Sequence, residues 1–358
     1  MRHLLYDIFE QIYSLEKSGS KIIKLNVGEP DWKPPRAAIE AAAFSMYSGE
    51  GKYGSSSGEI ELRELLSQAH ECKTENITIT PGSKFAIYSL LRMHLKRGDN
   101  AIISSPYWTA YSLICKHIGA KIKLIETADN GWKPDISKFE DAIDSRTRLI
   151  ILNSPSNPTS IALEEDKESE LLFLAQRKGI LLFADDAYRD LCFDGRKERP
   201  LAPNLIIVNS FSKTFGMTGW RIGYAVMPKE TASKLSQLNR ITITNVPLFL
   251  QKGVLSALKH KKRFVRKVRN VCMRRLTFAS KFLSNTLRFQ KPNAGFYIFP
   301  ALPNGMDASL FADKLLQNGV AVVPGMSFGN YKSHIRISLC YNERILAQAF
   351  KKINSLLT

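Results

Sequence analysis

The sequence predicts an α/β fold, with a large domain built on a mostly parallel sheet between helices and a smaller α+β domain. Three observations indicate this. Short apolar segments alternate with amphipathic ones from residue 76 onward, long helical patterns replace the alternation after about residue 228, and strand-like segments return near the C-terminus. Repeated alternation of strands and helices is typical of parallel sheets with helices on both faces.

Seven apolar segments are expected to form the large sheet. They are residues 76–80, 100–105, 121–126, 148–153, 180–185, 205–210 and 220–227. Amphipathic segments such as 84–95 and 164–178 lie between them and are predicted helices. The segments AGFYIFP, GVAVVPG and HIRISLC supply strands of the smaller domain. We expect an N-terminal arm and part of the small domain over 1–40, the large domain over 41–260, and the small C-terminal domain over 261–358.

Composition excludes several classes of protein. A chain of 358 residues that is 44% hydrophobic and 23% charged can bury a large core. No apolar run approaches the roughly 18 residues of a membrane span, and the N-terminus lacks the basic start and apolar block of a signal peptide, so we expect a cytoplasmic protein. The five cysteines form no C-x-x-C pair and the six histidines no H-E-x-x-H spacing, so no metal site is indicated.

The formal charge of +18 raises the question of an acidic partner. Much of it lies in KHKKRFVRKVRNVCMRR, residues 259–275, where apolar residues recur near helical spacing between the cations. This pattern favours a helix with a buried stripe and a solvated basic face. A nucleic-acid site is the weaker alternative, because no recognised nucleic-acid motif accompanies the run.

Polar residues follow several of the predicted strands. Residues 81–84 follow the first strand, 153–157 and Asp185 end two others, and Ser210–Lys213 follow a fourth. In open α/β sheets, ligands bind outside the carboxyl ends of the strands. We therefore expect these groups to meet at one site.

Lys213 stands among small hydroxyl residues in NSFSKTFGMTGWRIGY. A solvated loop lysine is the ordinary interpretation. The alternative is an amine nucleophile that binds a carbonyl cofactor, which requires that its neutral form be reachable well below the free pKa of about 10.4.

Eight stretches in order resemble the aspartate aminotransferase family, the class I/II pyridoxal 5'-phosphate (PLP) enzymes of fold type I. They are VGEPDW, YGSSSGEIELRE, TPGSK, SPYWTAY, NSPSNPTS, FADDAYRDL, SFSKTFGMTGWRIGY and HIRISL, from residue 27 to 339. The resemblance implies a transaminase that binds PLP in the large domain. It also implies an amino acid and a 2-oxo acid as substrates, and a homodimer whose two active sites are shared across the interface.

The resemblance assigns catalytic roles. Lys213 would bind PLP covalently and then move the substrate's α-proton, and Asp185 would face the ring nitrogen. Tyr188 and Asn157 would hydrogen-bond the phenolic oxygen of the ring. Asp186, where relatives usually have glutamate, is expected to cap or to be solvated.

The resemblance also implies a phosphate site and a ring-stacking residue. Gly82, Ser83 and Lys84 begin a predicted helix, whose N-terminus favours anions. By resemblance, the other residues around the cofactor are Ser210, Arg221, Trp108 and, from the neighbouring subunit, Tyr53. Without the resemblance, Arg221 would be a strand-edge charge and Trp108 a core aromatic residue.

Substrate residues follow in the same way. Arg336 matches the arginine that binds the α-carboxylate, with an ion pair in the small domain as the alternative, and the Gly28 backbone lies nearby in relatives. Lys84 would also lie near a distal carboxylate. We therefore expect 2-oxoglutarate as acceptor and aspartate or an aromatic amino acid as donor, in a pocket with Trp32 and Tyr107.

The sequence differs from the family pattern at two places, and two other functions remain as alternatives. Ser160 replaces the usual glycine, which matters if that turn needs a positive φ, and the N-terminal arm is shorter than usual. A PLP-dependent carbon–sulfur β-lyase would use the same residues. A PLP-sensing regulator would need an N-terminal DNA-binding domain, for which we see no room.

Overall fold

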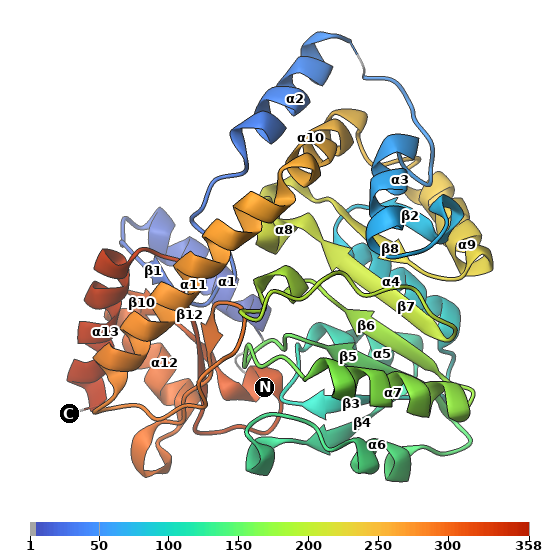
Figure 1. Cartoon of the computed structure of the whole chain (residues 1–358). Helices are drawn as coiled ribbons and strands as arrows, with labels where there is room; N and C mark the ends of the chain where they lie inside the picture. The colour runs from blue at the N-terminus through green and yellow to red at the C-terminus, as the bar shows by residue number, and fades with distance from the viewer. Residues whose placement is uncertain (1–4, 50, 358) are drawn as a thin grey trace.

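The computed structural model describes residues 5–49 and 51–357, and a seven-stranded sheet lies at its centre (Figure 1). The strand order is β2-β8-β7-β6-β5-β3-β4. The strands are β2 (Ile77–Thr80), β3 (Asn100–Ser105), β4 (Lys121–Glu126), β5 (Thr147–Asn153), β6 (Leu181–Asp185), β7 (Leu205–Ser210) and β8 (Gly223–Val226). Neighbouring strands are parallel except at β8, which runs antiparallel to both β2 and β7. The predicted α/β fold with a mostly parallel sheet is confirmed.

Helices cover both faces of this sheet. One face packs against α3 (Ile60–Ala69), α6 (Ile136–Ala142), α7 (Glu165–Arg177) and α10 (Leu248–Lys259), and the other against α4 (Ser83–His94), α5 (Ala110–Ile118) and α9 (Lys229–Thr242). Along β5, Ile150 and Leu152 contribute to one core and Leu149 and Ile151 to the other. A strand buried on both faces is apolar at every position, which explains the continuous apolar runs in the sequence.

The N-terminal and C-terminal segments meet beside the large sheet. β1 (Ile23–Lys24) pairs in parallel with β10 (Val320–Ala321), and β9 (Tyr297–Ile298), β12 (Ile335–Ser338) and β11 (Val323–Pro324) form an antiparallel sheet. The helices here are α1 (Leu5–Lys17), α11 (Lys261–Leu283), α12 (Ala308–Gln317) and α13 (Glu343–Leu357), and α2 (Arg36–Tyr47) packs on α10 (Figure 1). The exact residue limits of the domains stay predictions.

The basic stretch begins at the end of α10, and from Lys261 onward it forms the first part of α11. Val265 and Val268 are buried on the inner side of the helix, while Lys262 and Arg263 are exposed, as the sequence predicted. Lys261 differs, because it forms an ion pair with Asp190 at 2.8 Å. No helix in the described part of the chain is long and apolar enough to span a membrane.

Candidate active site

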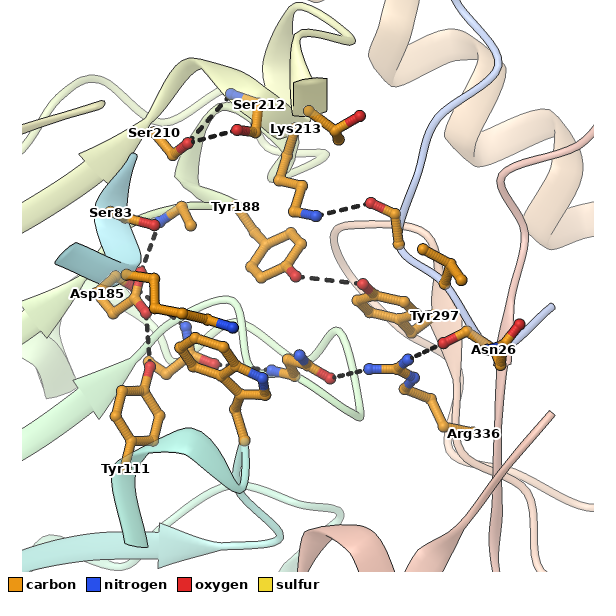
Figure 2. Close-up of a pocket in the computed structure, with 18 of the residues that line it drawn as sticks. Asn26, Ser83, Tyr111, Asp185, Tyr188, Ser210, Ser212, Lys213, Tyr297 and Arg336 are labelled. Atoms are coloured by element: carbon orange, nitrogen blue, oxygen red, sulfur yellow. Dashed lines mark hydrogen bonds between the residues drawn. The ribbon is translucent and has the colours of Figure 1, made fainter. Parts of the chain in front are cut away.

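The predicted site residues converge on one cavity of about 270 Å³ at the carboxyl ends of the strands (Figure 2). Those that line it are Gly28, Ser83, Lys84, Trp108, Asn157, Asp185, Tyr188, Ser210, Lys213, Arg221 and Arg336. They come from the large seven-stranded sheet and the turns that follow its strands, from β12 of the three-stranded sheet, and from the segment after β1. The expectation that the strand-end groups meet is therefore confirmed.

Lys213 lies on a short turn that follows β7. Ser210 is the N-cap of α8 (Phe211–Thr214), and its Oγ accepts a hydrogen bond from the Ser212 backbone N–H at 3.2 Å. The Lys213 amine donates to the carbonyl oxygen of Gly28 at 2.7 Å. Burial lowers the pKa of this lysine to about 8, because the charged ammonium loses its hydration. The solvated-loop interpretation is therefore excluded.

Asp185 ends β6 and is 4% exposed. Its carboxylate accepts hydrogen bonds from the Tyr111 hydroxyl at 2.6 Å and from the Ala187 backbone N–H at 3.1 Å. Burial raises its pKa to about 6, although these two donors oppose the shift. A buried carboxylate near neutrality at the floor of a cavity is typical of a functional group.

Arg336 projects from β12 toward the large sheet and is buried. Its guanidinium donates to Asn157 Oδ1 at 2.8 Å and to the carbonyl oxygen of Asn26 at 2.5 Å. A guanidinium has more N–H donors than these two bonds use, and Nε has no hydrogen-bond partner in the described structure. The group can therefore take up a carboxylate. The alternative of an ion pair in the small domain is wrong, since its partners are an amide and a carbonyl.

The turn between β2 and α4 forms an anion cradle. Gly82 has φ +78°, and a Cβ there would lie 2.7 Å from a terminal nitrogen of Arg221. A Cβ on Gly223 would lie 2.8 Å from the backbone nitrogen of Ser83, the first residue of α4. The missing side chains thus let a guanidinium and a helix N-terminus approach one position, an arrangement that suits a phosphate.

Comparison with known proteins identifies the family. The family model described as aminotransferase class I and II matches residues 20–353. The chain belongs to this family. Aspartate aminotransferase of Thermococcus kodakarensis is 33% identical, over 94% of this chain and 88% of the relative. Aspartate/prephenate aminotransferase of Thermus thermophilus is 32% identical, over 94% and 91%.

A solved structure supports the same assignment. The aspartate aminotransferase from Thermus thermophilus with maleate superposes with a TM-score of 0.92 at 29% identity, and the match covers 100% of this chain and 97% of that one. The chain is thus an aminotransferase, and aminotransferases of this family depend on PLP. The cavity fits that cofactor, because it combines a lysine of lowered pKa, a buried carboxylate and an anion cradle.

Two predicted residues lie outside the cavity lining of this aminotransferase. Gly82 precedes the lining residue Ser83, and a Cβ on Gly82 would lie 2.7 Å from the guanidinium of Arg221, which also lines the cavity. Tyr53 is 87% exposed, and its predicted contact is with a neighbouring subunit, so the single chain leaves that contact a prediction.

Three other predictions need correction. Asp186 neither caps nor is solvated: it is 1% exposed and forms an ion pair with Arg199 at 3.1 Å, because the large core closes over it. Neither Trp32 nor Tyr107 is among the described residues that line the cavity. Trp32 donates its indole N–H to the carbonyl oxygen of Thr214 at 3.2 Å, and Tyr107 packs on the core beneath α4 and α5.

The sequence analysis missed several lining residues, among them Asn26, Tyr111 and Tyr297. Tyr111 follows Trp108 by one helical turn, and this spacing could have indicated that the two rings share a face; they pack edge to face at 5.4 Å. Tyr297 was predicted as a strand residue, but no local pattern marks which neighbour it meets.

Proposed function

We propose that this aminotransferase moves the amino group of an L-amino acid to 2-oxoglutarate, with aspartate and aromatic amino acids as the leading donors. The observation that carries the proposal is the set of four cations lining the cavity in the described part of the chain. These are Lys84, Lys213, Arg221 and Arg336. The names of relatives and of solved structures, which mention aspartate and maleate, support a substrate with two carboxylates.

Three of the cations have a role that their surroundings support. Lys213 is the cofactor lysine, Arg221 faces the anion cradle, and Arg336 would bind the α-carboxylate beside Asn157 and the Gly28 carbonyl. Lys84 lines the same cavity, with its amine 5.3 Å from the centroid of the Trp108 ring, and we assign it to the distal carboxylate. A flexible ammonium can serve a dicarboxylate in one half-reaction and an uncharged side chain in the other.

The protein groups act around a cofactor that supplies an electron-accepting ring. Asp185 would hold a proton at the ring nitrogen and would itself stay in its carboxylate form there. The Tyr188 hydroxyl and the Asn157 amide would donate hydrogen bonds to the phenolic oxygen. Because its pKa is about 8, Lys213 can supply a neutral amine near neutral pH and move the proton at the substrate's Cα.

Two further points belong to the proposal. We infer a homodimer in which Tyr53 of each chain reaches the phosphate bound by the other, since Tyr53 is exposed and is not among the described residues that line its own cavity. We also propose that the enzyme acts in the cytoplasm.

A screen of donors and acceptors in wild-type protein and Lys84→Met tests the proposal. Wild type should transfer amino groups from aspartate and phenylalanine to 2-oxoglutarate. Lys84→Met should raise KM for 2-oxoglutarate by tenfold or more, equivalent to about 1.4 kcal/mol, and change KM for pyruvate little, because only the first acceptor has a second carboxylate.

The control is the same pair of acceptors with Lys33→Met, an exposed lysine that is not among the described residues lining the cavity, which should leave both KM values unchanged. An equal rise in KM for both acceptors in Lys84→Met would place Lys84 at the phosphate or in the fold, and would remove the preference for a dicarboxylate. Pyruvate and ammonia formed without any acceptor would indicate a β-lyase instead.

A further inference from the structure

Ser160 adopts a backbone conformation that glycine adopts more easily. Its φ is +53°, in the left-handed region, and its side chain is 1% exposed. The turn around it is closed by a hydrogen bond from its own backbone N–H to the carbonyl oxygen of Ser156 at 2.8 Å. A buried serine held in a strained conformation indicates that its hydroxyl makes an interaction that offsets the strain.

That interaction joins the turn after β5 to β9. The Ser160 Oγ accepts a hydrogen bond from the backbone N–H of Tyr297 at 2.9 Å. The residue that faces the Ser160 side chain is Gly295, which has φ +61°. A Cβ on Gly295 would lie only 2.6 Å from the Ser160 Oγ. The serine side chain therefore occupies the space that the missing side chain of Gly295 leaves. The Ser160 side chain fits the space at Gly295, and its hydrogen bond holds the backbone of Tyr297 in position beside the cavity.

Tyr297 in turn contacts three positions of the site. Its hydroxyl lies 3.2 Å from the Tyr188 hydroxyl, and its ring lies 4.4 Å from the Arg336 guanidinium carbon. A Cβ on Gly28 would lie 1.8 Å from the Tyr297 hydroxyl, so the phenol fills the space beside the carbonyl that binds Lys213. Figure 2 shows Tyr297 between Tyr188 and Arg336.

Either phenol can donate the hydrogen bond between Tyr188 and Tyr297, and its direction follows from the proposed role of Tyr188. Burial raises the pKa of both Tyr188 and Tyr297, so both keep their protons at neutral pH. If Tyr188 donates its proton to the phenolic oxygen of the cofactor, as proposed above, its own oxygen is left to accept. Tyr297 is then the donor.

We propose that Tyr297 is a further residue of the cofactor site, which donates a hydrogen bond to Tyr188, and that Ser160 is its positioning residue. The inference rests on the proposed role of Tyr188. A donor at the Tyr188 oxygen polarises the Tyr188 hydroxyl and strengthens its bond to the phenolic oxygen. The Ser160 hydroxyl holds the Tyr297 backbone in place. Ser160 lies on the turn after β5 of the large sheet, and this turn also carries Asn157.

The test is a pH titration of the visible absorbance of the PLP-loaded protein. Loss of a donor leaves the negative charge on the phenolic oxygen less stabilised, so the cofactor holds its proton to higher pH. Tyr297→Phe should raise the midpoint by about half a pH unit or more. Ser160→Ala and Ser160→Gly should each raise it by a smaller amount. In the Tyr297→Phe background, Ser160→Ala should add no further change, because both act through one hydroxyl.

The two Ser160 variants separate hydrogen bonding from strain. Ser160→Gly relieves the left-handed backbone and Ser160→Ala does not, so their melting temperatures should differ while their midpoints agree. Thr159→Val is the matched control, because Thr159 is buried in the same turn and its hydroxyl accepts a hydrogen bond from the Ile161 backbone N–H within that turn. Its midpoint should equal that of wild type.

The outcomes separate the inference from the proposed function. Unchanged midpoints in Tyr297→Phe and in both Ser160 variants, with normal wild-type absorbance, would overturn the inference alone. A midpoint that moves with Tyr297→Phe but with neither Ser160 variant would overturn the role of Ser160. Failure of the wild-type protein to take up PLP would overturn both the proposed function and the inference.

Discussion

Two residues at the centre of the site have pKa values shifted toward each other. Burial raises that of Asp185 to about 6 and lowers that of Lys213 to about 8, in each case because the charged form is poorly hydrated. Each shift suits the role proposed above, because the lysine can offer a neutral amine and the carboxyl is held where a cationic partner would keep it ionised. Their types could be predicted from the sequence, but these shifts follow from burial that only the fold supplies.

Tyr111→Phe should destabilise the cofactor-free protein in a pH-dependent way. The folded pKa of Asp185, about 6, exceeds the ordinary value of 3.8, so the folded state binds more protons between these pH values and loses stability as pH rises through them. Loss of the Tyr111 donor raises the folded pKa further. Urea unfolding should show that the free energy of unfolding of Tyr111→Phe is about 1.5–3 kcal/mol below that of wild type at pH 7.5. The difference should be smaller at pH 5, where the carboxyl is protonated.

Tyr88→Phe is the control for this comparison, since Tyr88 is 39% exposed on the surface of α4 and should change little at either pH. An equal loss at pH 7.5 and pH 5 for Tyr111→Phe would show that the tyrosine contributes by packing rather than by its bond to the carboxylate.

At the scale of elements, the sequence predicted the strands well because most strands of the large sheet are buried on both faces, although the edge strand β4 is largely exposed. The carboxyl ends of these strands then locate Asp185 and Lys213. Partners such as Tyr297 could not be predicted, because their contacts cross from the small sheet to the large one. Trp32 was assigned to the pocket by residue type alone, and its indole instead hydrogen-bonds the turn that follows Lys213.

The turn from β2 to α4 offers a prediction at this scale. Gly82→Ala should weaken PLP binding by tenfold or more, equivalent to about 1.4 kcal/mol, because the new Cβ must displace the Arg221 guanidinium from the cradle. Gly98→Ala is the matched control: Gly98 has φ +91°, and a Cβ added there would meet no atom within 4 Å. Both variants should lose about 1 kcal/mol of stability from backbone strain.

Equilibrium dialysis against PLP measures the difference. If Gly82→Ala and Gly98→Ala bind PLP equally well, the glycine serves only the backbone of the turn, and the phosphate lies elsewhere in the cavity.

At the scale of the whole molecule, apolar side chains are exposed on α2 and in the segment after it, and an apolar cavity adjoins the site. α2 exposes Phe44 at 73% and Tyr47 at 92%, and the following segment carries Tyr53 at 87%. A second, apolar cavity of about 450 Å³ shares Lys84 and Arg221 with the active site. Exposed apolar surface of this kind marks association sites, and the apolar cavity adjoins the anion cradle at Arg221. It supports the homodimer proposed above, in which a second chain would cover the site.

Complementation between inactive chains tests whether the sites are shared. A dimer of one Tyr53→Ala chain and one Lys213→Ala chain has one site with both residues intact if Tyr53 acts across the interface. Random mixing makes about half of the dimers hybrid, with one complete site of two, so activity should recover to about a quarter of wild type. The control mixes Lys213→Ala with Asp185→Asn. Because both residues lie in the cavity of one chain, that hybrid has no complete site and should stay inactive. Recovery in neither mixture, after labelled subunits are seen to exchange, would mean that Tyr53 does not serve the partner's phosphate.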